Sequence, residues 1–239
     1  MTKQNKIPPI EAAHQFIKDH FFYCQGALLA GSVVRKEATE TSDLDIVIFD
    51  KSVSSAYRES VVEYGWAIEV FVYNLTSYKE FFEIDYKRAR PSLPRMIAEG
   101  RILKDEGVIN LIKKEANALL QKGPEEWSEE TIHTKRYFIT DTLDDFIGSS
   151  SRAEDLFIAN ALFELVCEFV LRTNCHWLGH SKWLIRSLRN YDEVFANHFV
   201  ESFELFYKTG SKEEVIQVVD EVLHPFGGRL FDGFSLGKS

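Results

Sequence analysis

The sequence contains no apolar run of the roughly 18–20 residues that a membrane-spanning helix needs, so no membrane partner is expected. Its first ten residues, MTKQNKIPPI, are polar and interrupted by proline, which argues against a signal peptide. Cysteine is scarce: Cys24, Cys167 and Cys175 are odd in number and widely spaced. They predict neither a disulfide framework nor a zinc ribbon, and we expect a cytoplasmic, reducing location.

An excess of basic residues is also missing. The chain has 28 Lys and Arg against 37 Asp and Glu, which gives a net charge of −9. A general nucleic-acid-binding protein usually carries a basic face, so no nucleic-acid partner is expected. The acidic balance is compatible with a cationic ligand or with carboxylates around metal ions, and equally with plain solubility.

The first half of the chain alternates between helical and extended patterns. With 239 residues, 45% of them hydrophobic, the protein can bury a substantial core. Apolar spacing and β-branched runs predict helices at 10–22, 52–64, 77–86 and 107–121, and strands at 26–30, 44–49 and 67–73.

The second half has no strand pattern. A linker, KGPEEWS, covers 122–128, and Ser128 followed by two glutamates is typical of a helix start. Helices are predicted at 131–147, 154–173, 182–189, 192–207 and 212–223. The expected fold class is therefore α+β: an α/β domain with a mixed sheet at 1–122, then an all-helical bundle at 128–239.

Two aspartates at the start of strand 44–49 are the strongest candidates for chemistry. Asp43 and Asp45 are two residues apart, so their side chains share one face of an extended strand. Two such carboxylates repel each other unless a cation lies between them, and Mg²⁺ prefers oxygen ligands that it shares with phosphates. Gly31 and Ser32 follow the preceding strand, where backbone N–H groups and a hydroxyl can approach a phosphate.

Glu69 is the candidate third carboxylate. It lies in the apolar strand 67–73, where a charge is costly to bury without a partner. If that strand pairs beside strand 44–49, Glu69 joins Asp43 and Asp45. Three carboxylates can hold two Mg²⁺ ions, which suits in-line attack on phosphorus. The alternative is an edge-strand residue that faces water.

The run GSVVRKEATETSDLDIVI, residues 31–48, resembles the signature of the DNA polymerase β nucleotidyltransferase superfamily. That signature combines Gly-Ser, then Ser-Asp-x-Asp at a fixed spacing, and a third acid on a later strand. The resemblance implies nucleotide binding by Gly31, Ser32, Arg35 and Ser42, and catalysis with two Mg²⁺ ions held by Asp43, Asp45 and Glu69.

Two positions depart from the pattern of this superfamily. Lys36 stands where many members of the small-protein branch have glycine, so the loop is expected to be stiffer or to reach a phosphate. Glu rather than Asp at position 69 is similar to the antibiotic-modifying (aminoglycoside-type) branch, in which a Glu-Val-x-hydrophobic-Tyr strand is familiar.

Helix 131–147 places acids opposite its apolar face. Asp141 and Asp145 are four residues apart, so their carboxylates are neighbours on one face of the helix. Because like charges repel there, the pair suggests a cationic ligand. The arrangement is similar to the first helix of the second domain in kanamycin-type aminoglycoside nucleotidyltransferases. This resemblance implies acceptor binding by Asp141 and Asp145, with Asp145 as the general base. A solvated polar face is the alternative, and it is preferred for Asp144.

Two further candidates lie in the helical half. Asn160, Glu164 and Glu168 form a polar stripe on helix 154–173, which either pairs with a neighbouring Arg or Lys or gives the acceptor a second acidic wall through Glu164. Lys182 lies in a Lys-Trp segment similar to one in antibiotic nucleotidyltransferases. There a lysine reaches the nucleotide phosphates; a solvated lysine is the alternative.

These features predict an Mg²⁺-dependent transferase that moves an NMP, first of all AMP from ATP, to a hydroxyl of a small molecule, with an aminoglycoside-like acceptor as one candidate. Substrate is not set by fold, so this acceptor rests on analogy. The alternatives are an antitoxin-type protein AMP-transferase, a catalytically silent nucleotide-binding regulator and an RNA-tailing enzyme. The helical half argues against the protein AMP-transferase, and the three intact acids argue against the silent regulator. The net charge of −9 argues against the RNA-tailing enzyme. A homodimer is compatible with the sequence.

Overall fold

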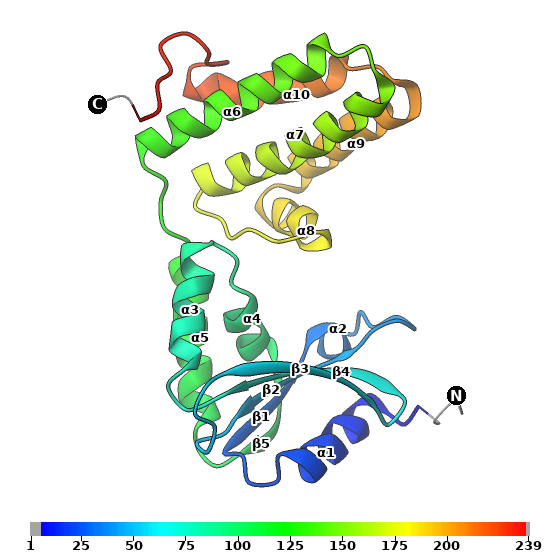
Figure 1. The fold of residues 1–239 in the computed structure, drawn as a ribbon, viewed down its shortest axis with the longest axis vertical. Coiled ribbons are helices and arrows are strands. Elements are labelled where there is room, and N and C mark those ends of the chain that lie inside the picture. The colour runs from blue at the N-terminus through cyan, green and yellow to red at the C-terminus, as the bar shows by residue number, and fades with distance from the viewer. Residues whose placement is uncertain (1–5, 238–239) are drawn as a thin grey trace. The chain divides into compact units, whose positions relative to one another are not determined.

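The computed structural model describes residues 6–237, and the chain forms two compact units, Met1–Lys122 and Gly123–Ser239 (Figure 1). The strands that the described residues form all lie in the first unit. Its elements are α1 (Pro9–His20), β1 (Gly26–Ala30), α2 (Gly31–Val34), β2 (Leu44–Phe49), β3 (Tyr57–Glu63), β4 (Trp66–Tyr73), α3 (Tyr78–Lys87), α4 (Ser92–Glu99), β5 (Arg101–Asp105) and α5 (Ile109–Lys122).

The sheet of the first unit is mixed, in the order β3-β4-β2-β1-β5. Strands β2 and β4 are parallel, and the other neighbouring pairs are antiparallel. The segment between β2 and β4 forms β3, which pairs with the outer side of β4. The mixed sheet followed by helices confirms the predicted α+β fold class.

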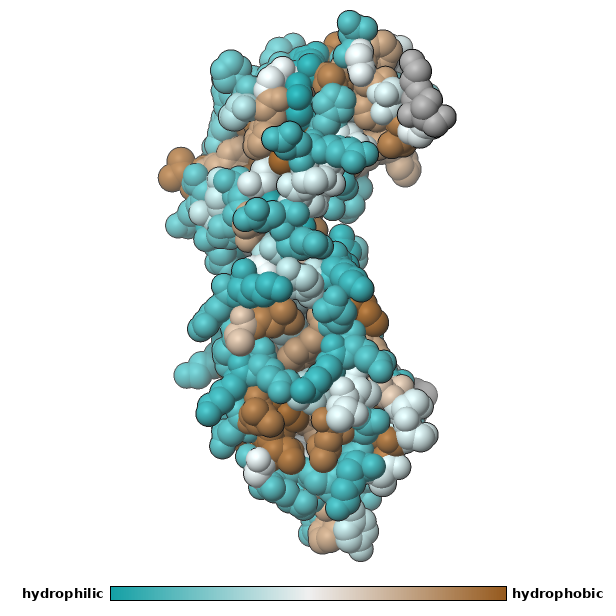
Figure 2. Space-filling model, turned by 90° about the vertical axis from the view of Figure 1, so that its left-hand side faces the viewer, coloured by the Kyte–Doolittle hydropathy of each residue, from teal (hydrophilic) through white to brown (hydrophobic). Residues whose placement is uncertain are grey.

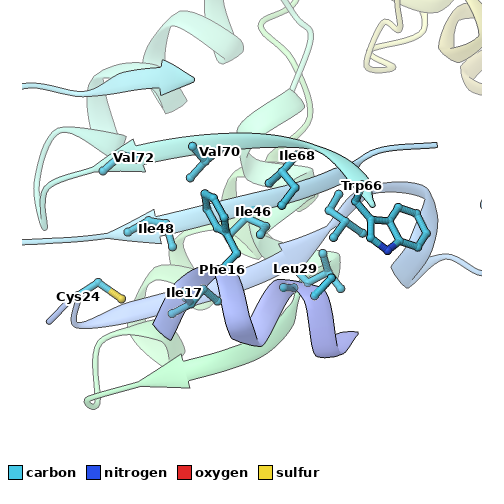
Figure 3. Close-up of a cluster of buried hydrophobic side chains, with 14 residues drawn as sticks. Phe16, Ile17, Cys24, Leu29, Ile46, Ile48, Trp66, Ile68, Val70 and Val72 are labelled. Atoms are coloured by element: carbon cyan, nitrogen blue, oxygen red, sulfur yellow. The ribbon is translucent and has the colours of Figure 1, made fainter. Parts of the chain in front are cut away.

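Alternating side chains divide the strands between two hydrophobic clusters. On one face α1 covers the sheet, and Phe16 and Ile17 pack against Ile46, Ile48 and their neighbours (Figure 3). On the other face α3, α4 and α5 cover the sheet, and their apolar side chains pack with those of Val47, Phe49 and Tyr73. The period of two along β2 and β4 explains why adjacent residues belong to different clusters.

The helix predicted at 52–64 is wrong, because most of this segment forms strand β3. β3 is an edge strand with little buried surface, so its sequence lacks the apolar alternation of a half-buried strand. Its missed signal is the two-residue turn Tyr64-Gly65, where both residues have positive φ (54° and 79°). Such turns join antiparallel strands, and this one joins β3 to β4. The short edge strand β5 was likewise not predicted.

The second unit is helical. It comprises α6 (Glu129–Gly148), α7 (Arg152–Thr173), α8 (Lys182–Tyr191), α9 (Glu193–Thr209), α10 (Glu213–Leu223) and the 3₁₀ turn η1 (His224–Phe226). The Ser128 side chain accepts a hydrogen bond from the Thr131 N–H, as expected for the predicted helix start. Several phenylalanines lie in its interior beside leucine and valine; for example, the rings of Phe146 and Phe206 meet edge to face at 4.9 Å.

The surface is largely hydrophilic on the face drawn in Figure 2, and hydrophobic residues gather there in separate patches. None of the helices in residues 6–237 has the length and apolar character required to cross a bilayer. All three cysteines are free: Cys24 and Cys167 are buried, and Cys175 is exposed.

Candidate functional site

Three carboxylates meet on the face of the sheet that α3, α4 and α5 cover. Asp45 of β2 is the register partner of Glu69 on the parallel neighbour β4, and Asp43 immediately precedes β2. One oxygen from each of Asp43, Asp45 and Glu69 lies within 4.8 Å of the others, and all three residues are half-buried. Among the described residues this is the group of His, Cys, Asp or Glu side chains close enough to hold a metal ion.

The electrostatics of this acidic triad favour a bound cation. Burial, together with the negative charges of Asp43 and Glu69, raises the pKa of Asp45 to about 6. Arg35 and Arg58 act in the opposite direction but do not cancel the effect. A divalent ion would relieve the repulsion, and the hard oxygen donors fit Mg²⁺.

Gly31 can lie close to Asp45 because glycine has no side chain. The residue begins α2 with φ of +74°, and a Cβ atom at this position would lie 1.8 Å from Oδ2 of Asp45. Only glycine accommodates both the backbone conformation and this approach. Ser32 follows Gly31 in α2 and is half-buried.

The loop between α2 and β2 holds the other nucleotide candidates. Arg35 forms ion pairs with Glu37 (Nε–Oε2 3.3 Å) and with Glu99 of α4 (Nη1–Oε2 3.2 Å). The Ser42 hydroxyl accepts a hydrogen bond from the Thr39 N–H at 2.8 Å, so it shapes the loop. Lys36 has φ of +61°, a left-handed conformation that glycine adopts more readily than lysine.

Arg58 is a neighbour of the triad that the sequence did not reveal. Its guanidinium donates a short hydrogen bond to Oε1 of Glu69 and lies 5.0 Å from the centre of the Phe71 ring. Arg58 is on β3, directly opposite Phe71 in the antiparallel register. Predicting β3 as a helix hid this pairing; the Tyr64-Gly65 turn was the signal that could have found it.

The predicted acceptor residues lie in the second unit. Asp145 is exposed on α6 and lines a 610 Å³ cavity with Asp144, Glu154 and Phe157. Asp141 is exposed on the same helix but does not line this cavity. Asp144 is exposed and pairs with Arg229 at 3.6 Å.

The polar stripe on α7 divides between two environments. Glu168 pairs with Lys135 of α6 at 2.6 Å, the neighbouring-lysine arrangement that was one of the two expectations. Glu164 is exposed on α7 and is not among the residues that line the 610 Å³ cavity. Lys182 is exposed at the first residue of α8.

One protein-family model matches the first unit. Residues 20–104 match the family model described as "Nucleotidyltransferase domain", a stretch that contains Gly31, the acidic triad and the entire sheet except the last residue of β5. A nucleotidyltransferase-like protein from Exiguobacterium sibiricum, known from its crystal structure, aligns with 91% of this chain and 75% of its own at 9% identity and a TM-score of 0.47. No curated protein matches the chain.

Proposed function

We propose that this protein is an Mg²⁺-dependent nucleotidyltransferase that moves an NMP, first of all AMP, from an NTP to a hydroxyl group of a small-molecule acceptor. The observation that carries the proposal is the acidic triad of Asp43, Asp45 and Glu69, whose oxygens lie within 4.8 Å of one another. The backbone of Gly31 lies beside Asp45 of this triad. The family match over residues 20–104 supports the same reaction class.

The residues of the first unit divide into metal and phosphate roles. Asp43, Asp45 and Glu69 would hold two Mg²⁺ ions, which supply charge neutralisation at the reacting phosphate when bound. The backbone at Gly31 and the hydroxyl of Ser32 would donate to the phosphates of the NTP. Arg35, half-buried and paired with Glu99, would hold the loop between α2 and β2 and place positive charge near the triphosphate.

The acceptor hydroxyl must also lose its proton. Asp145 is our candidate base, with Asp141 and Glu164 as acceptor-binding residues and Lys182 as a phosphate contact. The exposed carboxylates of Asp141 and Asp145, one helical turn apart, support a polar or cationic acceptor such as an aminoglycoside. We expect Asp145→Asn to lower turnover and to spare NTP binding; a variant that loses NTP binding would transfer Asp145 to the nucleotide site.

Calorimetric titration of ATP with and without Mg²⁺ tests the proposed reaction class. Wild-type protein should bind ATP in an Mg²⁺-dependent manner, and Asp43→Asn should lose this binding because one metal ligand is removed. Glu83→Gln is the matched control, since Glu83 is an exposed acid on α3 that pairs with Lys87. Equal binding by wild type and Asp43→Asn would refute the metal site.

The same titration separates the alternatives. If ATP does not bind, the series GTP, CTP and UTP identifies another nucleotide, and failure of all four would favour a different function. Binding without turnover on any acceptor would favour the silent regulatory protein. Labelled ATP that modifies a protein instead of a small molecule would favour the protein AMP-transferase.

A further inference from the structure

The face of the sheet that carries the acidic triad also has a 540 Å³ cavity, which opens between β3, β4, α3 and α4. The lining contains four aromatic rings and two guanidinium groups: Tyr57, Arg58, Phe71, Tyr73, Phe81 and Arg88. Its volume is within the range of small-molecule sites, and all of its walls belong to the first unit.

The cavity begins beside the acidic triad. Glu69, Phe71 and Tyr73 alternate along β4, so they share one face of the sheet. Phe71 lies two residues from Glu69, about 7 Å along the strand. Arg58 connects the two places, because its guanidinium contacts Glu69 and also stacks near Phe71 in the cavity wall.

The order of the strands places the cavity and Gly31 on opposite sides of the triad, which bears on the direction of the reaction. Gly31 and Ser32 follow β1, the triad lies on β2 and β4, and the cavity lies on β4 and β3. In phosphoryl transfer the entering and leaving oxygens lie roughly in line on opposite sides of the phosphorus. If the leaving pyrophosphate rests at Gly31, the entering hydroxyl comes from the side of the cavity.

The lining determines which molecule would fit. Four rings provide flat apolar contact surface, which suits an aromatic body. Asp85 is the acid in the lining, but its oxygens already accept from Arg88 (2.5 Å) and from the Leu93 N–H (2.8 Å). The Arg58 guanidinium is mostly exposed at the cavity and can donate to a carboxylate or phosphate group.

We propose that this cavity is the acceptor site, and that the acceptor is a hydroxylated aromatic molecule with an anionic group that Arg58 recognises. The inference rests on the proposed nucleotidyl transfer and names its substrate class. It is an alternative to acceptor binding by Asp141 and Glu164, and it replaces the cationic acceptor considered above with an anionic one. In the reaction the acceptor oxygen bonds to the α-phosphorus, the bond from that phosphorus to the bridging oxygen breaks, pyrophosphate leaves with that oxygen, and the hydroxyl proton passes to a carboxylate.

The test uses three phenols that differ mainly in charge: para-hydroxyphenylacetate, para-ethylphenol and tyramine. Their binding to the full-length protein, with Mg²⁺ and a non-hydrolysable ATP analogue present, is measured by ligand-observed NMR titration. The anionic phenol should bind tightest and tyramine weakest, because Arg58 attracts the carboxylate and repels the ammonium group. Tyramine binding tightest, or displacement of the anionic phenol by adenosine, would overturn the inference; the latter would make the cavity the nucleobase site.

Variants locate the binding within the cavity. Arg58→Ala should weaken binding of the anionic phenol roughly ten-fold or more, and Arg58→Lys should restore part of it. Arg90→Ala is the matched control, since Arg90 is an exposed arginine of the same unit outside the lining. Equal losses in Arg58→Ala and Arg90→Ala would overturn the assigned role of Arg58.

The controls keep the two proposals apart. If the ATP analogue binds with Mg²⁺ and none of the phenols binds, the acceptor inference fails while the proposed reaction class stands. If neither the ATP analogue nor the corresponding GTP, CTP and UTP analogues bind in any metal condition, both fail. If the analogue and the anionic phenol both bind, label transfer from ATP to para-hydroxyphenylacetate is the decisive further readout.

Discussion

At the scale of single residues, the site depends on how closely Gly31 approaches Asp45. The approach leaves no room for a Cβ atom, and φ of +74° disfavours any other residue. The carboxylate of Asp45 can therefore adjoin the backbone at Gly31, where the phosphates of a nucleotide are expected.

Gly31→Ala is predicted to displace the Asp45 carboxylate and abolish Mg²⁺-dependent ATP binding. It should also lower the free energy of unfolding by roughly 1–3 kcal/mol, because of the left-handed backbone and the clash. Calorimetry and urea unfolding measure the two effects. Gly107→Ala is the control: φ there is +93°, yet a Cβ atom would have no neighbour within 4 Å. Comparable loss of ATP binding in both variants would contradict the close-approach argument.

A pH dependence follows from the raised pKa of Asp45. Its pKa is about 6 in the folded protein against 3.8 for the ordinary carboxyl, so the folded state holds this proton more tightly. Ionisation of Asp45 therefore lowers the stability of the metal-free protein as pH rises from about 4 to about 6. The loss is at most on the order of 3 kcal/mol above that range, at 1.36 kcal/mol per pKa unit.

Comparison of wild type with Asp45→Asn isolates this contribution from other titrating groups. The two metal-free proteins should be similarly stable near pH 4, and the variant should be the more stable one at pH 7.5. Urea unfolding across this range measures the difference, which should not change with pH if the pKa of Asp45 is ordinary. Mg²⁺ binding by wild type should weaken below about pH 6, because the proton competes with the ion.

At the scale of secondary structure elements, the β3–β4 hairpin determines the environment of Glu69. Antiparallel pairing sets Arg58 opposite Phe71 and brings its guanidinium to Glu69. The sequence predicted β4 and Glu69, because an acid within an apolar strand is conspicuous. It did not predict β3, because an exposed edge strand shows neither an apolar face nor a clear period of two.

The turn of this hairpin is predicted to be sensitive to substitution. At Gly65, φ is +79° and a Cβ atom would lie 2.6 Å from Cα of Lys6. Gly65→Ala should therefore lower the free energy of unfolding by roughly 2 kcal/mol, measured by urea unfolding. Gly210→Ala has a similar φ of +84° without a neighbour within 4 Å, so it separates backbone strain from the clash. An equal cost in both variants would mean that the contact with Lys6 is unimportant.

At the scale of the whole molecule, the two units differ in what they contribute. The first unit contains Gly31, the triad, Arg58 and the 540 Å³ cavity, together with both hydrophobic clusters of the sheet. The second unit contains Asp141, Asp145, Glu164 and Lys182 on α6, α7 and α8. Metal binding should therefore need the first unit alone.

A fragment of residues 1–122 is predicted to fold and to bind Mg²⁺ with an affinity similar to that of the full chain. Circular dichroism checks the fold, and calorimetry with Mg²⁺ measures the binding. A folded fragment without Mg²⁺ binding would show that the metal site needs a residue of the second unit. Asp43→Asn in the fragment is the control for binding outside the triad.

The sequence by itself determined the fold class and most of the helices and buried strands. These elements carry their own periodic patterns, and the spacing of Gly31, Asp43 and Asp45 describes one short segment of chain. Local patterns of this kind do not depend on distant residues. For the same reason the start of α6 at Ser128 could be predicted from its capping residue.

Only the tertiary structure decided which distant residues meet. The parallel register of β2 and β4 brings Glu69 to Asp45, and the antiparallel register of β3 and β4 brings Arg58 to Glu69. The cavity beside them is formed by four consecutive elements, β3, β4, α3 and α4, whose packing brings their side chains together. Strand pairing and packing join residues of different elements, so no pattern within a single element could have specified the aromatic walls of the cavity. The guanidinium beside the triad could have been predicted only by recognising the Tyr64-Gly65 hairpin turn.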